Sequence, residues 1–96
     1  MSLSPQEYNQ LKAFRDLIAS TMSRLDQAQS QGPLSQAVGD VAPQWDGIDP
    51  DFANVLRDVG NSVWTMPFIQ VRPTVEAIVG HLGAQLGEID QQLAAG

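Results

Sequence analysis

The chain has 96 residues, of which 43% are hydrophobic, with no cysteine and a formal net charge of −6 at pH 7. This length predicts a single domain over 1–96 with one modest core, and the lack of cysteine excludes disulfides, thiolate metal sites and cysteine nucleophiles. Only five basic residues are present and they form no cluster, so we do not expect nucleic acid as a partner.

The N-terminus has neither the basic start nor the continuous apolar run of a signal peptide. The most apolar window, 63–71, contains a proline and is far shorter than the roughly 20 apolar residues of a transmembrane helix. We therefore expect a soluble, cytoplasmic protein without a transmembrane segment.

A long first helix is predicted over residues 4–30. Ser4 can act as the N-cap, Pro5 suits the first helical position, and Glu7 completes a capping box. The pattern is expected to stop before the Gly-Pro pair at 32–33. Apolar side chains recur with helical spacing at Leu11, Phe14, Ile18, Met22 and Leu25.

The segment 31–49 is predicted to be an irregular linker. Pro33, Gly39 and Pro43 interrupt any helical pattern there, and turn-forming Gly-Asp and Asp-Gly pairs add further breaks. A single helical turn at 34–38 would raise the number of helices from three to four.

A further helix is predicted over 50–65. Asp49 can cap it and Pro50 suits its first position, while Pro67 ends the pattern. Its apolar stripe consists of Phe52, Val55, Leu56, Val59 and Val63.

Residues 66–73 allow two interpretations. In the first, they form an extended linker. In the second, Pro67 starts the last helix and Pro73 kinks it. A proline inside the helix costs about 3 kcal/mol, which packing must offset. From 73 to 94 a helix is predicted in either case.

The last helix carries an apolar stripe with steps of four and three residues, beside a second stripe of glycines. Three interior glycines at about 1 kcal/mol each make this helix unstable alone. We expect it to depend on a closely packed neighbouring helix, from the same chain or from a second copy. The apolar stripe is Val75, Val79, Leu82, Leu86, Ile89 and Leu93, and the glycines are Gly80, Gly83 and Gly87. Together these elements predict an all-α fold, with helices packed mainly antiparallel.

The sequence contains no recognisable catalytic or metal-binding set. His81 is the only histidine, and no acidic residue lies three or four positions from it, so it is interpreted as structural. An EF-hand loop starting at Asp46 would need glycine at its sixth position and glutamate at its twelfth, but Asp51 and Arg57 stand there. We therefore expect no enzyme activity, no metal and no cofactor.

Trp45-Asp46-Gly47 is a Trp-x-Gly tripeptide near the middle of a predicted helical chain. In this respect the chain resembles the WXG100 family of small secreted helical-hairpin proteins, which type VII systems export. The resemblance implies a continuous hairpin of two long helices with Trp45 at the bend. The chain departs from that pattern by the prolines and glycines in both halves and by the lack of a Tyr-x-x-x-Asp/Glu tail signal.

The leading hypothesis for function is a non-enzymatic protein–protein interaction module, such as an adaptor, an assembly subunit or a small regulator. Its partner is another protein or a second copy, since residues 75–93 could form a homodimer. One alternative is an acidic inhibitor that covers a basic surface with Asp40, Asp46, Asp49, Asp51 and Asp58; another is a WXG100-like secreted protein. The residues expected to make contacts are Trp64, Met66, Phe68, Val75, Val79, Leu82, Gly83, Leu86, Gly87, Ile89 and Leu93.

Overall fold

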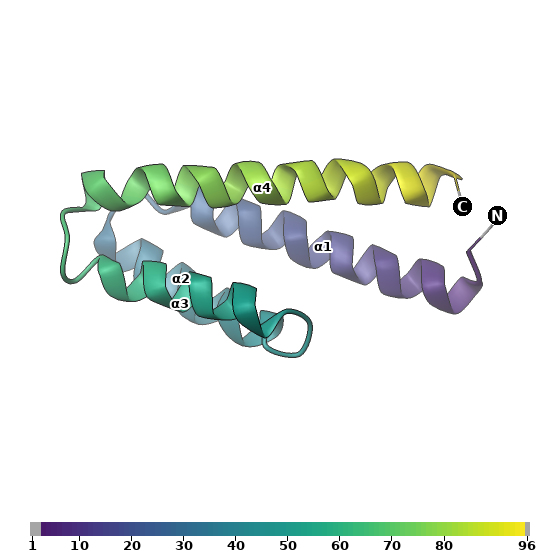
Figure 1. The fold of residues 1–96 in the computed structure, drawn as a ribbon, viewed down its shortest axis with the longest axis horizontal. Helices are drawn as coiled ribbons and strands as arrows, with labels where there is room; N and C mark the ends of the chain where they lie inside the picture. Colours follow the sequence, from purple (N-terminus) through teal and green to yellow (C-terminus); the bar gives the residue numbers. More distant parts are fainter. Residues whose placement is uncertain (1–2, 96) are drawn as a thin grey trace.

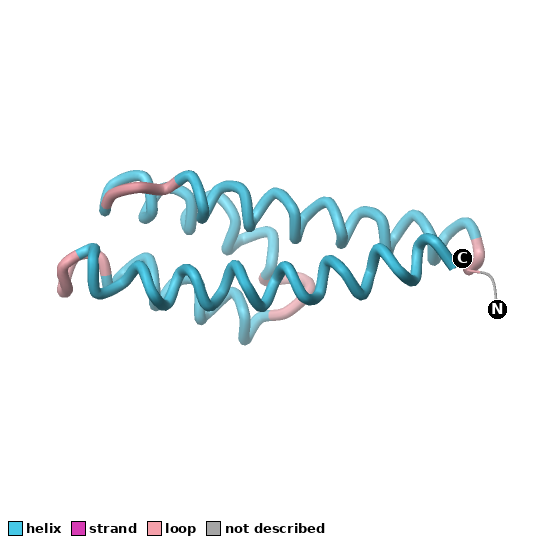
Figure 2. The backbone as a smooth tube through the Cα atoms, turned by 90° about the horizontal axis from the view of Figure 1, so that it is seen from above, coloured by secondary structure: helices cyan, strands magenta, loops and turns pink. Residues whose placement is uncertain are grey.

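The computed structural model describes residues 3–95, which form four α-helices and no strand. The two long helices, α1 and α4, lie antiparallel, and the two shorter ones, α2 and α3, form a hairpin against one end of them (Figures 1 and 2). The predicted all-α, antiparallel bundle-like fold is therefore confirmed. The helices are α1 (Pro5–Gln27), α2 (Gln31–Trp45), α3 (Pro50–Ser62) and α4 (Phe68–Ala95).

The shorter hairpin leaves part of the long pair uncovered. At 1.5 Å per residue, the 28 residues of α4 and the 15 residues of α2 differ in length by about 20 Å. The N-terminal half of α1 and the C-terminal half of α4 therefore project as a two-helix arm (Figure 1). This arm explains the elongated shape of the molecule, which measures 48 × 21 × 18 Å.

The starts of α1 and α3 follow the predicted capping chemistry. The Ser4 hydroxyl accepts a hydrogen bond from the backbone N–H of Glu7 at 3.1 Å, and the Asp49 carboxylate accepts one from the N–H of Phe52 at 3.2 Å. Each cap satisfies a donor that has no partner within its helix. Proline at the first position of each helix removes another such donor.

The prediction of an irregular linker over 31–49 is wrong, because residues 31–45 form helix α2. Pro33 lies in the first turn, where backbone N–H groups have no partner within the helix, so its lack of an N–H breaks no hydrogen bond. Pro43 lies in the last turn, on the exposed side. The two prolines and Gly39 lower the helix propensity of this segment, but the burial of its apolar face against the other helices outweighs that loss. The buried face of α2 is Leu34, Ala37, Val38, Val41, Ala42 and Trp45, which repeats at helical spacing.

Three predicted helix boundaries also shift. Helix α1 ends at Gln27, because Ala28 turns extended and is buried, and α3 ends at Ser62. Helix α4 starts at Phe68 instead of 73, with Pro73 inside it. Of the two interpretations of 66–73, the helix that begins directly after Pro67 is the one observed.

The Trp-x-Gly tripeptide ends α2 and begins the turn into α3, so Trp45 does lie at a bend between helices. The two helices that meet there are the short ones, however. The continuous two-helix hairpin implied by the WXG100 resemblance is therefore wrong for this chain.

Trp45 fixes the short hairpin to α1. Its buried indole N–H donates a 3.0 Å hydrogen bond to the Thr21 hydroxyl, which donates in turn to the carbonyl of Leu17 at 2.8 Å. The ring also meets Phe14 and Phe52 edge-to-face, with centroid distances of 5.7 and 4.6 Å. Such pairs add about 0.5–1.5 kcal/mol each beyond area burial.

Within the short hairpin, α2 and α3 approach closely at one glycine. A Cβ atom on Gly60 would lie 2.9 Å from Cγ1 of Val38, a buried residue of α2. A β-branched valine in a helix has one strongly preferred rotamer, so it cannot easily move aside. Gly60 thus sets the distance between the two helices.

We predict that Gly60→Ala lowers the free energy of unfolding by about 1–3 kcal/mol, since the added methyl overpacks the core against Val38. Urea denaturation followed by circular dichroism measures the change. Gly80→Ala is the matched control, because nothing lies within 4 Å of its added methyl, and it should stabilise the protein by about 0.5–1 kcal/mol. Equal effects of the two substitutions would contradict the close approach.

We also predict that Thr21→Val destabilises the fold by about 1–3 kcal/mol, because it leaves the buried indole N–H of Trp45 without a partner. Thr21→Ser keeps the hydroxyl and should lose less stability. The same urea titration separates the two variants. A Thr21→Val variant as stable as wild type would show that the hydrogen bond contributes nothing to stability.

Candidate interaction surface

Most of the predicted contact residues on α4 face the interior of this chain. Val75, Leu82 and Ile89 are buried, and Val79, Leu86 and Leu93 are half-buried against the core. The principal neighbour of α4 is α1. The apolar stripe is therefore largely used within the molecule.

The glycine stripe of α4 does not meet a helix along its length. A Cβ on Gly83 would lie 3.4 Å from Cε of Met22, in ordinary contact, but Cβ atoms on Gly80 and Gly87 would meet nothing within 4 Å. The expected close helix approach is therefore limited to Gly83. Gly80 and Gly87 are exposed.

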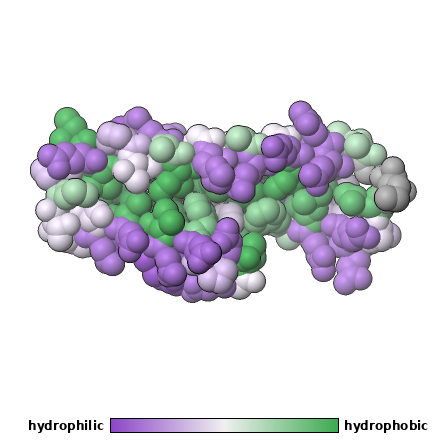
Figure 3. Space-filling model, viewed as in Figure 1, coloured by the Kyte–Doolittle hydropathy of each residue, from purple (hydrophilic) through white to green (hydrophobic). Residues whose placement is uncertain are grey.

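The predicted residues Trp64 and Met66, just before α4, lie at the surface together with Ile69 of its first turn. Trp64 is 66% exposed, Met66 40% and Ile69 78%, all within the connection from α3 to α4 and its first helical turn. We call these three residues the corner surface. Figure 3 shows hydrophobic surface at the end of the molecule where α4 begins. Large apolar side chains exposed this close together are typical of a contact site.

The backbone that carries the corner surface is fixed at both ends. Val63 and Val71 are buried on either side of it. The Gln31 side chain donates a 2.6 Å hydrogen bond to the carbonyl of Val63, and the N–H of Met66 donates to the carbonyl of Ser62 at 2.9 Å. The exposed side chains therefore stand on an ordered turn, which reduces the entropy lost when a partner binds.

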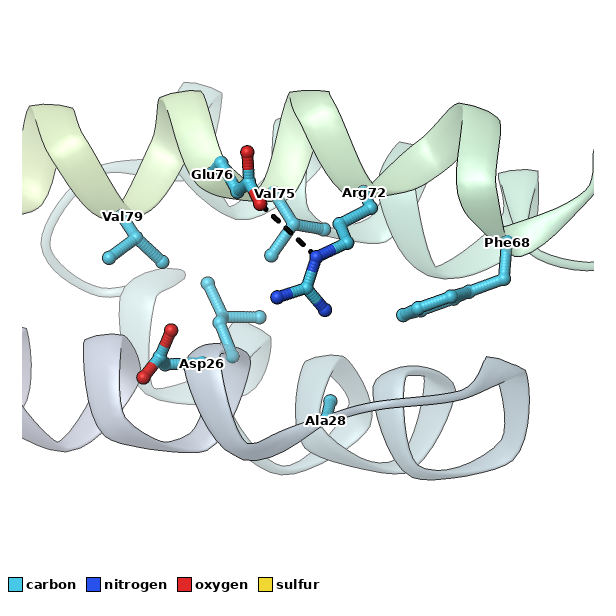
Figure 4. A pocket seen from close by; sticks show the side chains of 8 residues that line it. Asp26, Ala28, Phe68, Arg72, Val75, Glu76 and Val79 are labelled. Carbon is cyan, nitrogen blue, oxygen red and sulfur yellow. Dashed lines mark hydrogen bonds and ion pairs between the residues drawn. The ribbon is translucent and has the colours of Figure 1, made fainter.

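A pocket of about 110 Å³ adjoins the corner surface, between the C-terminal end of α1 and the start of α4. Figure 4 shows Phe68 at one end of the pocket, Val79 at the other and the Arg72 guanidinium between the two helices. Its apolar lining is Leu25, Ala28, Phe68, Val75 and Val79, and its polar lining is Asp26, Arg72 and Glu76.

The ion pairs leave an unbalanced surface charge. Each arginine contacts at least one carboxylate: Arg15 with Asp16 and Asp90, Arg24 with Asp40, Arg57 with Asp46, and Arg72 with Glu76. Within residues 3–95, Lys12 is the one Lys or Arg side chain outside these pairs, whereas many carboxylates lie outside them. The latter are Glu7, Asp26, Asp49, Asp51, Asp58 and Glu88.

The acidic residues near Gly47 are partly used by the fold. Arg57 donates two hydrogen bonds to the Asp46 carboxylate, and these lower the pKa of Asp46 below its ordinary value. Asp49 caps α3. The predicted acidic cluster is thus divided between an ion pair, a helix cap and the exposed side chains of Asp51 and Asp58.

We predict that Arg57→Gln raises the pKa of Asp46 toward its ordinary value, because both hydrogen bonds to the charged form are lost. A carboxyl-detected NMR titration measures this pKa, with Arg24→Gln as the control that should leave it unchanged. Because the folded pKa is lowered, the pair stabilises the fold above the unfolded pKa of Asp46, and this contribution disappears as pH falls through the folded pKa. An Asp46 pKa that is the same in wild type and Arg57→Gln would contradict this assignment.

Among the described residues, no three His, Asp or Glu side chains are grouped so that they could hold a metal ion. His81 is exposed on α4. Within residues 3–95, no helix has the length and apolar character needed to span a membrane.

No protein-family model matches the chain, and searches of curated proteins and of solved structures give no significant match. The case for function therefore rests on the surface itself.

Sequence reasoning missed two residues at this site and considered a third, Ile69, only as part of the apolar group around Pro67. Arg72 was missed because residues 66–73 were left open between a linker and a helix, and Asp26 because nothing in the sequence shows that the end of α1 faces the start of α4. The i, i+4 pair Arg72–Glu76 was a usable helical signal across Pro73.

Proposed function

We propose that the protein is a non-enzymatic protein–protein interaction module that binds its partner at the corner surface. The observation that carries this proposal is the exposure of Trp64, Met66 and Ile69 on an ordered turn. Tryptophan and methionine are enriched in the cores of interfaces, and tryptophan is among the residues that most often dominate binding energy. A cytoplasmic location remains the prediction from the sequence.

Two other hypotheses receive less support. The acidic inhibitor would use five aspartates, but Asp40 and Asp46 are neutralised by arginines of the same chain and Asp49 caps a helix. A homodimer through residues 75–93 would need a face of α4 that already packs against α1. Neither hypothesis makes use of the corner surface.

The experiment compares three tagged proteins in affinity purification from the native host, followed by quantitative mass spectrometry. The corner variant carries Trp64→Gln, Met66→Gln and Ile69→Gln, and the control carries Ile48→Gln and Val55→Gln, two residues that are 52% and 45% exposed elsewhere. All five sites are exposed, so both variants should remain folded.

We expect a specific partner to be recovered with wild type and with the control. The amount recovered with the corner variant should be at least tenfold lower, because the apolar side chains at the centre of the contact have been replaced. Circular dichroism and thermal unfolding verify that both variants are folded. If all three proteins recover the same partners in equal amounts, the corner surface is not the binding site.

A further inference from the structure

The pocket beside the corner surface has room for one aliphatic side chain. Its volume of about 110 Å³ is smaller than the roughly 150 Å³ of an apolar cavity that accepts benzene. Leu25, Phe68, Val75 and Val79 supply apolar walls. A branched four-carbon group, as in a leucine side chain, matches this size and polarity.

The charged side chains that line the pocket, Asp26, Arg72 and Glu76, carry a net charge of −1, which disfavours an anion. The Arg72 guanidinium is already engaged, donating to Glu76 at 3.1 Å and to the side-chain oxygen of Gln29 at 3.2 Å. Asp26 forms no ion pair with any of residues 3–95. The pocket lining therefore includes a carboxylate without an ion pair, on a chain of net charge −6, which attracts a cation and repels a second copy.

The size and shape of the site favour a short segment over a folded domain. The surface area that three exposed side chains and one small pocket can bury is well below the roughly 800 Å² per partner of stable interfaces. The pocket lies in the groove between two antiparallel helices (Figure 4), and such grooves accept an amphipathic helix through anchors at i, i+3 and i+4. Ile69 stands one turn before Arg72 on α4, where it can extend that contact.

We propose that the α1–α4 pocket and the corner surface bind a short basic amphipathic helix of a protein partner. One leucine-type side chain of that helix enters the pocket, and a lysine or arginine one turn away faces Asp26. This inference rests on the proposed function and adds the chemistry of the partner to it.

The test uses the full chain and synthetic peptides of about 15 residues, long enough to form a helix when bound. The probe peptide contains alanine and glutamine with one central leucine and a lysine four residues later, and both ends are blocked. One matched peptide replaces the leucine with alanine, and another replaces the lysine with glutamate. Methyl NMR spectra follow Leu25, Val75 and Val79 during each titration.

We expect saturable shifts of these three residues with the probe peptide. The alanine peptide should bind at least tenfold more weakly, because it leaves the apolar pocket empty. The glutamate peptide should bind two- to fivefold more weakly at low ionic strength, and high salt should reduce that difference.

Two valine-to-phenylalanine variants give a matched comparison on the protein side. Val79→Phe fills the pocket and should abolish the shifts of Leu25 and Val75, whereas Val55→Phe on α3 should leave peptide binding unchanged. Should Val79→Phe fail to fold, Asp26→Asn supplies a second variant, which should remove the preference for lysine over glutamate.

Several outcomes overturn the proposal. These are no saturable shift at the pocket, shifts centred on Asp51 and Asp58, or a glutamate peptide that binds as tightly as the probe at low salt. Shifts of the pocket residues caused by phosphatidylcholine vesicles alone, or by raising the protein concentration alone, would assign the site to a membrane or to self-association.

The two proposals fail in different ways. If the peptides do not bind the pocket but the corner variant still loses its native partner, the helix-in-groove inference is wrong and the interaction surface stands. If no native partner depends on the corner surface, both proposals are overturned.

Discussion

The position of the α2–α3 hairpin on the long helices depends on how the indole ring of Trp45 packs. Trp45 is buried where α1, α2 and α3 meet, with its N–H bonded to Thr21 and its faces and edges against Phe14 and Phe52. A tryptophan at the end of a short helix contributes both a large apolar area and one polar atom that must be satisfied. Thr21 meets that requirement from α1, so the α2–α3 hairpin docks at one place along the long helices. The length of the uncovered arm follows from that position.

The sequence predicted the parts of the fold that depend on local chemistry. The caps at Ser4 and Asp49 and the amphipathic stripes gave the correct class and the correct starts of α1 and α3. Helix α2 was missed because Pro33, Gly39 and Pro43 are local signals against a helix, whereas its stability comes from the buried side of the hairpin. The pairing of the helices depends on contacts between residues that are far apart in the sequence. No spacing in the sequence placed α1 against the stripe of α4.

The candidate site was predicted in part, for the same reason. Trp64, Met66 and Phe68 stood out as apolar residues around a proline, but their exposure depends on the way the turn leaves the bundle. Val63 and Val71 take the interior positions, and the side chains between them must then point outward or half outward. The pocket could not have been predicted, because its two walls come from helices that are about forty residues apart in the chain.

The nesting of one hairpin inside another also affects the order in which we expect the bundle to assemble. Helices α2 and α3 are joined by a short turn, whereas α1 and α4 are separated by the whole inner hairpin. Closing the longer connection in a disordered chain costs roughly 2 kcal/mol more, on a logarithmic dependence of entropy on length. Once α2 and α3 have paired, the ends of α1 and α4 are brought together and most of that entropy is already lost. We therefore expect the inner hairpin to form first and the long helices to close on it.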